Sequence, residues 1–333
     1  MKRSDFVQQQ GVECDFTSSD SWVILSPIEQ SIKRKIETMG TPLKDWDINI
    51  YRGVLTGYNE AFIISTEKRN EILAKCFTED ERARTAELIR PILRGRDIKR
   101  YGYEWVGLYL IATFPSQHYD VELYPAVKTY LLSFAKENLI KCGYQWVADN
   151  YLEDFCKQKL EQTGTTIEIQ GRHIRIGKCD EKSRKKTNNK WFETQDSINY
   201  WEDFDKPKIV WKRVGSILRF CYNENSALAL DSTCFATGNN VEYLCCLLNS
   251  PMGHYLLKDA PQTGTGDLLI SVQAVEPIMV PLISEEKNKY FINSLKKLIE
   301  HKSPSLQKEI NYKVYELYNL SLDEQNYIEE NFS

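Results

Sequence analysis

The spacing of apolar residues near the start of the chain predicts a helix with defined ends. Ile28, Ile32 and Ile36 recur at helical spacing. The segment Ser26-Pro27-Ile28-Glu29 supplies an N-cap, a proline at the first helical position and a capping-box glutamate. Gly40 is expected to end the helix in a left-handed conformation.

Strand and helix patterns alternate over the next hundred residues. The alternation in Trp46–Ile50 predicts a strand, and the apolar runs Ala61–Ile64 and Val106–Phe114 predict buried strands. Between these runs, Thr78-Glu79-Asp80-Glu81 is a second capping box that opens a helix. Pro125 begins a long helix with an apolar face.

The second half of the chain continues this mixture and then becomes helical. We expect strands at Lys208–Val214 and Ile217–Tyr222, a short buried helix at Val241–Asn249 and extended structure over Leu268–Val280. From Ser284 to the end the pattern is helical, with apolar stripes on successive helices. The sequence therefore predicts a mixed α/β (α+β) fold with a C-terminal helical segment.

Composition narrows the function classes. The 333 residues carry a formal net charge of −4, which argues against a protein that coats DNA through charge alone. No run of 18 apolar residues suggests a membrane helix. Nine scattered cysteines without Cys-x-x-Cys spacing, and four histidines, argue against zinc and favour reduced thiols in a cytoplasmic protein.

Motifs of DNA-modifying chemistry are missing from the sequence. No Pro-Pro occurs, so the (Asp/Asn)-Pro-Pro-(Tyr/Phe) segment of an adenine methyltransferase is absent, and no Gly-Lys-(Ser/Thr) occurs. Glu285-Glu286-Lys287 has the letters of a nuclease motif but falls at the start of a charged helix, where a solvated turn is the better interpretation. We therefore expect no catalytic residue and no metal site in this chain.

Two basic clusters are candidates for nucleic-acid contact. Arg94, Arg96, Lys99 and Arg100 lie within seven residues. Their side chains suit phosphates or guanine edges, although a charged surface turn with Asp97 pairing an arginine explains them equally well.

The second cluster lies in residues 172–190, where eight lysines and arginines face two acidic residues. Its end supplies cations for phosphates, amides for adenine edges and Trp191 for packing or stacking. A solvated loop is the alternative interpretation. The residues concerned are Arg184, Lys185, Lys186, Asn188 and Asn189.

Glycine-containing loops and paired cysteines allow simpler interpretations. Gly53–Asn59 and Thr263–Asp267 are either phosphate-binding backbone nests or ordinary turns. Cys245 and Cys246 fit small core residues.

An ordered set of segments resembles a known family. It resembles the TaqI-like C-terminal specificity domain, or target recognition domain, of fused restriction–modification enzymes of the Eco57I kind. The resemblance covers residues 21–333, apart from Thr165–Cys179, which is interpreted as a local insertion. Its segments include Gly40–Trp46, Ile50–Gly53, Thr56–Phe62, Pro91–Ile98, Trp191–Gln195, Lys206–Trp211, Leu247–Ser250 and Val314–Leu320.

The resemblance implies a role and an organisation for the chain. Residues 1–20 would be a linker from a missing upstream catalytic region, residues 21–283 a DNA target recognition domain, and residues 284–333 a helical spacer or docking segment. The chain would recognise duplex DNA and direct adenine-N6 methylation, and in some systems cleavage, by a methyltransferase or endonuclease partner. S-adenosylmethionine and Mg²⁺ are expected only in that partner.

Three competing functions remain open at this stage. The chain would be a protein-interaction scaffold of a restriction–modification complex without direct base readout, a catalytic protein, or a binder of single-stranded nucleic acid or RNA. The missing motifs weigh against catalysis, and the basic segment 172–190 weighs against a scaffold that never touches DNA.

Overall fold

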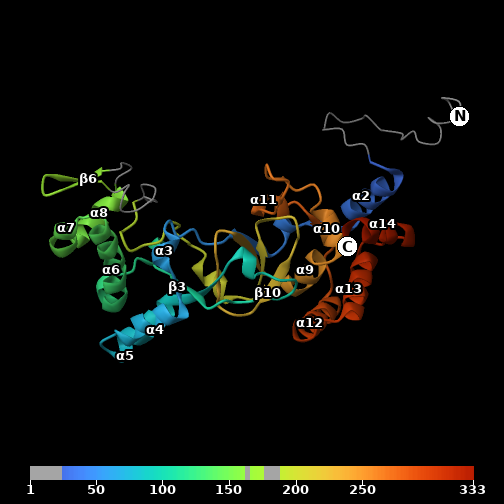
Figure 1. Ribbon diagram of the computed structural model, residues 1–333. Coiled ribbons are helices and arrows are strands. Elements are labelled where there is room, and N and C mark those ends of the chain that lie inside the picture. The colour runs from blue at the N-terminus through green and yellow to red at the C-terminus, as the bar shows by residue number, and fades with distance from the viewer. Residues whose placement is uncertain (1–24, 162–165, 176–187) are drawn as a thin grey trace, which may run out of the picture. The chain divides into compact units, whose positions relative to one another are not determined.

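The structure is a computed structural model that describes residues 25–161, 166–175 and 188–333 (Figure 1). The contacts divide the described chain into two compact units. Unit 1 contains residues 25–49, 214–220 and 238–333, and unit 2 contains residues 50–213 and 221–237. The mixed α/β fold with a helical C-terminal segment is confirmed. The domain boundaries at residues 20 and 283 stay a prediction, because units defined by contacts need not coincide with functional domains.

Unit 1 begins with the predicted helix, α2 (Pro27–Met39), whose capping box between Ser26 and Glu29 is present. The left-handed end at Gly40 is wrong, because its φ is −92° and the backbone is extended. Glycine is required there for another reason. A β-carbon would lie 2.7 Å from the backbone carbon of Met279, where β1 (Thr41–Pro42) pairs antiparallel with β14 (Met279–Val280).

The helices of unit 1 pack around α9 (Val241–Leu248), whose apolar residues are all buried. The predicted stripe on α12 (Glu285–Glu300), which includes Phe291 and Leu295, is buried, and this helix contacts α9. Glu285-Glu286-Lys287 is exposed in the first turn of α12, as predicted. Further helices of unit 1 are α10 (Pro251–Leu256), α13 (Pro304–Leu317) and α14 (Leu322–Phe332).

The extended structure predicted over Leu268–Val280 is only partly present. β13 (Leu268–Leu269) pairs with β9 (Val214–Gly215), and β14 ends the segment. Between them the chain forms the short helix α11 (Val272–Val275). Within the described residues, every helix is too short or too polar to cross a lipid bilayer.

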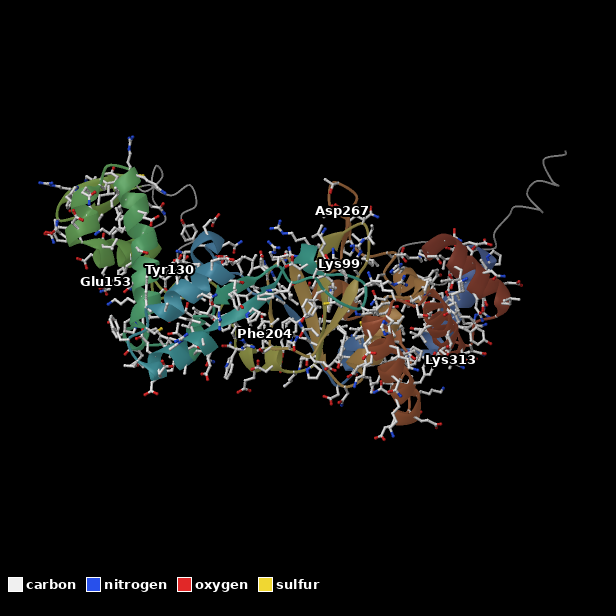
Figure 2. The ribbon with its side chains drawn as sticks, turned by 60° about the horizontal axis from the view of Figure 1, so that its bottom comes forward. Lys99, Tyr130, Glu153, Phe204, Asp267 and Lys313 are labelled. Atoms are coloured by element: carbon white, nitrogen blue, oxygen red, sulfur yellow. The ribbon has the colours of Figure 1, made fainter. Side chains whose placement is uncertain are left out.

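Two four-stranded sheets form the framework of unit 2. The first has the order β10-β8-β12-β2, and the second has the order β11-β4-β5-β3. The predicted strand Ala61–Ile64 is wrong in its first half, because α3 (Asn59–Phe62) precedes β3 (Ile63–Ser65). Phe204 is fully buried in the core of this unit (Figure 2). The strand bounds are β2 Ile48–Arg52, β4 Ile89–Leu93, β5 Leu108–Ile111, β8 Lys208–Lys212, β10 Phe220–Asn223, β11 Leu228–Ala229 and β12 Thr233–Gly238.

Helices of unit 2 are joined by a buried carboxylate. Glu81, near the start of α5 (Glu79–Leu88), accepts hydrogen bonds from the amides of Phe77 at 2.8 Å and Ala126 at 3.0 Å. The second amide belongs to the first turn of α6 (Pro125–Lys141), so one side chain caps two helices. The short 3-10 helices are η1 Leu43–Asp45 in unit 1 and η2 Gly95–Asp97, η3 Pro115–Gln117, η4 Val121–Leu123 and η6 Trp201–Asp205 in unit 2.

A smaller core lies within unit 2 around Val147, Phe155 and Ile174. It is formed by α6, by the helices α7 (Gln145–Asn150) and α8 (Leu152–Glu161), and by a hairpin of β6 (Thr166–Ile169) and β7 (Arg172–Arg175). The hairpin turns at Gln170 and Gly171, which both have positive φ, as two-residue turns require.

Gly53 allows two backbone segments of unit 2 to approach closely. A β-carbon at this position would lie 2.1 Å from the carbonyl oxygen of Leu230. We expect Gly53→Ala to lower the free energy of unfolding by about 2 kcal/mol, because the backbone must shift to relieve the overlap. Urea unfolding measures the change. Gly102→Ala is the matched control, because nothing lies within 4 Å of its β-carbon. Equal stabilities of the two variants would contradict the prediction.

Lys208 is a fully buried cation at the start of β8. Its ammonium donates to the carbonyl oxygens of Phe204 at 2.7 Å and Asn225 at 2.5 Å. Burial, assisted by the charge of Arg90, lowers the pKa of Lys208 from 10.5 to about 8.

The unfolded chain therefore binds more protons than the folded chain between about pH 8 and the ordinary lysine value of 10.5, and stability due to Lys208 rises with pH over this window. Relative to Lys208→Met, the wild type should gain about 1 kcal/mol between about pH 7.5 and pH 9. Urea unfolding at both pH values measures this difference, and a constant difference between the two proteins would refute the prediction.

Candidate nucleic-acid interface

The first predicted basic cluster forms a rigid turn after β4. The guanidinium of Arg94 makes two hydrogen bonds to the carboxylate of Asp97, at 3.1 and 2.8 Å, and the backbone amide of Arg94 makes a third at 2.9 Å. The Asp97 side chain is only 2% exposed. Arg94 therefore holds the turn in shape, and a role of this residue in DNA contact stays a prediction.

The turn lies against the end of β8. The amide of Gly95 donates to the hydroxyl of Ser232 at 3.1 Å, and the amide of Arg213 donates to the carbonyl oxygen of Ser232 at 3.0 Å. A β-carbon at Gly95 would lie 2.8 Å from Cγ of Lys212. The aliphatic stem of Lys212 therefore crosses the turn, and its side chain is exposed.

These contacts place Lys212 and the backbone of Arg213 beside the turn after β4, and we call the cations of these two neighbouring segments the basic turn surface. It comprises Arg96, Lys99, Arg100, Lys212 and Arg213. Arg96, Arg100 and Lys212 are exposed, and Lys99 and Arg213 are partly exposed. Figure 2 labels Lys99, whose side chain is 39% exposed.

Few acidic side chains of the described residues pair with the cations of the basic turn surface. Lys99 pairs with the exposed Glu104 at 3.2 Å, and the Arg100 guanidinium lies 5.6 Å from the ring centre of Tyr101. Among described residues, no acidic side chain pairs with Arg96, Lys212 or Arg213. Such a surface can attract phosphates, and its arginines can make bidentate hydrogen bonds to guanine.

Lys212 and Arg213 were missed as candidates from the sequence. They end the predicted strand Lys208–Val214, and two adjacent cations are a weak signal by themselves. Their place beside Arg96 depends on the pairing of Ser232 with both segments, which the sequence does not reveal.

The second predicted cluster is described only at its end. Arg184, Lys185 and Lys186 lie outside the described residues. Asn188 is exposed. The amide nitrogen of Asn189 donates to the carbonyl oxygens of Thr194 at 2.7 Å and Gln195 at 2.9 Å, so this side chain braces its own loop. Trp191 packs against both cores of unit 2.

Several backbone amides of the glycine loop Gly53–Asn59 donate hydrogen bonds to other groups of the protein. Val54 donates to the carbonyl oxygen of Ala229 at 2.7 Å, Leu55 to the carboxylate of Asp196 at 3.1 Å and Tyr58 to the hydroxyl of Thr56 at 3.1 Å. This favours a structural turn over a phosphate nest. The loop Thr263–Asp267 closes on itself through the Thr263 amide and the Asp267 carbonyl, and Figure 2 shows Asp267 at the surface.

Metal ligation and thiol chemistry find little support in the described chain. Over residues 25–161, 166–175 and 188–333, no three His, Cys, Asp or Glu side chains gather as a metal site would require. Cys245 and Cys246 are fully buried free thiols in α9. Burial raises the pKa of Cys246 far above its ordinary value, which keeps the thiol unreactive.

Comparison with known families identifies the centre of the chain. Residues 163–272 match the TaqI-like C-terminal specificity domain. The resemblance predicted from the sequence is thereby confirmed. The matched range includes Lys212, Arg213 and residues 165–179, which we had interpreted as an insertion. The chain thus has a mixed α/β fold, and its residues 163–272 are similar to a TaqI-like specificity domain.

The comparison with solved structures found a similar fold in one restriction–modification enzyme. The type IIL restriction–modification enzyme MmeI, determined in complex with DNA, has a TM-score of 0.51 at 8% identity, covering 88% of this chain and 36% of MmeI. The type IIG restriction endonuclease BpuSI has a TM-score of 0.45 at 11% identity, covering 92% of this chain and 33% of BpuSI. This chain therefore spans about a third of each protein. The comparison with curated proteins found no match.

Proposed function

We propose that this chain recognises a specific sequence in double-stranded DNA for a restriction–modification enzyme. The match of residues 163–272 to a specificity domain carries the proposal. The basic turn surface supports it, because five cations gather there in a chain whose formal net charge is −4. Local charge of this kind supplies phosphate affinity that the overall charge would not.

The chemistry would reside in a catalytic domain or subunit outside this sequence. That partner would methylate adenine at N6, and in a cleaving system also cut DNA, with S-adenosylmethionine and Mg²⁺ bound to the partner. A cytoplasmic location follows from this role and agrees with the free cysteines of the described chain.

The proposal is tested by measuring whether the chain, together with its catalytic partner, binds one DNA sequence more tightly than another. Methylated adenines are first mapped in the genome of a host that expresses both, which gives the recognised site. Fluorescence anisotropy then compares a duplex carrying that site with a scrambled duplex. We expect at least a hundredfold difference in affinity. Equal affinity for both duplexes, or a genome without methylated sites, would contradict the proposal.

Docking of the catalytic partner by residues 284–333 stays a prediction. The apolar stripe on α12 that suggested docking is buried in unit 1, so deletion of this segment would unfold the unit. Exposed apolar side chains give a better test, because Tyr312 and Leu322 are 52% and 70% exposed. Tyr312→Ser with Leu322→Ser should weaken co-purification of the partner without lowering the melting temperature. Unchanged co-purification would remove the support for docking by these two side chains.

A further inference from the structure

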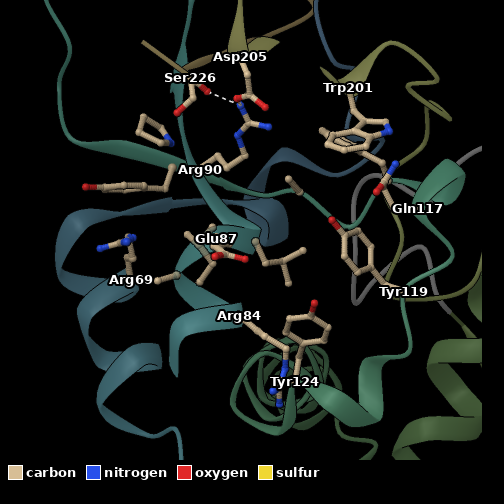
Figure 3. A pocket seen from close by; sticks show the side chains of 17 residues that line it. Arg69, Arg84, Glu87, Arg90, Gln117, Tyr119, Tyr124, Trp201, Asp205 and Ser226 are labelled. Atoms are coloured by element: carbon tan, nitrogen blue, oxygen red, sulfur yellow. Dashed lines mark hydrogen bonds and ion pairs between the residues drawn. The ribbon is translucent and has the colours of Figure 1, made fainter. Parts of the chain in front are cut away.

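An open pocket of about 610 Å³ lies in unit 2 (Figure 3). Its walls come from α4 (Thr66–Ala74), α5, β4, β5, η6 and the segment between β5 and α6. The volume falls within the range of about 300–1,000 Å³ that is typical of small-molecule sites. None of its lining residues belongs to the basic turn surface.

Aromatic side chains border much of this pocket. Figure 3 shows Tyr119 and Trp201 on one side of the space and Tyr124 beside Arg84. The rings of Tyr119 and Tyr124 meet edge to face at 5.8 Å. Burial raises the pKa of both phenols, so their hydroxyls stay protonated and available as donors at neutral pH. Half-buried rings of this kind offer flat surfaces for a planar ligand.

The three arginines that line the pocket differ in the hydrogen bonds and contacts that they already make. Arg90 is committed, because it binds the carboxylate of Asp205 and the carbonyl oxygen of Ser226. Arg69 lies 4.8 Å from the ring centre of Tyr109, and its Nε is buried without a hydrogen-bond partner among the described residues. Arg84 is exposed and, among the described residues, donates one long hydrogen bond of 3.3 Å to the carbonyl oxygen of Leu123.

Figure 3 shows the guanidinium of Arg84 beside Tyr124, that of Arg69 at another edge of the pocket, and the carboxylate of Glu87 apart from both. An exposed arginine such as Arg84 is well suited to a phosphate, and a carboxylate accepts hydrogen bonds from amino or imino groups of a base. The aromatic walls, the arginine and the carboxylate together match the parts of a nucleotide.

We propose that this pocket binds a nucleotide, with its base along Tyr119 and Trp201, its phosphate on Arg84, and a base N–H donated to Glu87. The nucleotide has two possible sources, a free nucleotide in solution or one nucleotide of bound DNA turned out of the duplex. The inference goes beyond the proposed function, which requires only a surface that reads DNA.

Calorimetric titration of the whole chain with the four deoxynucleoside monophosphates tests the pocket. We expect saturable binding of at least one of them, weakened about tenfold in Arg84→Ala, because a charge-assisted hydrogen bond to phosphate is lost. Arg82→Ala is the matched control, since it removes an exposed arginine of the same helix that does not line the pocket. Binding of none of the four, or equal loss in both variants, would overturn the proposal.

Competition with DNA identifies the source. If the occupant is a nucleotide of bound DNA, saturating deoxynucleoside monophosphate weakens DNA binding, and Tyr119→Ala does so as well. If the occupant is a free nucleotide, DNA affinity stays unchanged under both conditions while Tyr119→Ala loses the nucleotide. If the chain does not discriminate DNA sequences but still binds a nucleotide, the proposed function is contradicted and the proposal for this pocket is not.

Discussion

Replacement of Lys212 and Arg213 by alanine is expected to weaken DNA binding by the intact enzyme about 10-fold to 100-fold near physiological salt. Both residues lie on the basic turn surface, and neither pairs with an acidic side chain in the described part of the chain. If each contacts one phosphate, the slope of log affinity against log salt should become shallower by about 2. Fluorescence anisotropy at several salt concentrations measures both quantities.

A control of equal charge separates local contact from a general loss of positive charge. Lys287 and Lys289 are exposed on α12 in unit 1. Their replacement by alanine removes the same two charges and should change affinity less than threefold, because neither lysine belongs to the basic turn surface and exposed charges without direct contact are screened. Equal losses in the two double variants would argue against an interface at the basic turn surface. A loss confined to the cognate duplex would instead assign base readout to Lys212 or Arg213.

Arg94→Ala is expected to lower the free energy of unfolding by about 3 kcal/mol, the largest stability effect among the changes considered. The guanidinium is the cationic partner of Asp97, whose side chain is 2% exposed. Its removal leaves a buried carboxylate without a counter-charge, and breaking a buried pair from one side is far more costly than the pair is worth. Urea unfolding measures the loss.

A double-mutant cycle distinguishes loss of this pair from loss of packing. If the pair is the cause, Arg94→Ala combined with Asp97→Ala should be less destabilised than the sum of the single variants, with a coupling of about 2 kcal/mol. Additive losses would show that Arg94 acts through its aliphatic stem. Either result also bears on the predicted DNA role of Arg94, because a residue that stabilises the turn affects binding to every sequence alike.

Local chemistry made several elements predictable from the sequence. The capping box at Ser26 is present, and the helix expected after Thr78 begins at Glu79. Caps involve residues three positions apart, so their geometry is encoded locally. Ala61–Ile64 was misassigned because a short apolar run fits a helix end as well as a strand. The conformation of Gly40 depends on Met279, which lies far away in the sequence.

The candidate site was less predictable for the same physical reason. Arg96, Lys99 and Arg100 could be recognised because they are neighbours in sequence. Lys212 joins them only through folding, when Ser232 binds both the turn and the end of β8. Conversely, the internal hydrogen bonds of Asn189 could not be anticipated, since an amide that reads adenine and one that braces a loop look alike in a sequence.

The division of the chain has a consequence for engineering new specificities. The backbone passes from one unit to the other at four places, after residues 49, 213, 220 and 237. Unit 2 is therefore not a cassette that can be exchanged with one cut and one rejoining. A chimera that imports another recognition surface has to transplant residues 50–213 and 221–237 together. Grafting either stretch alone would separate the turn that carries Arg96 from Ser232, which anchors it to the end of β8.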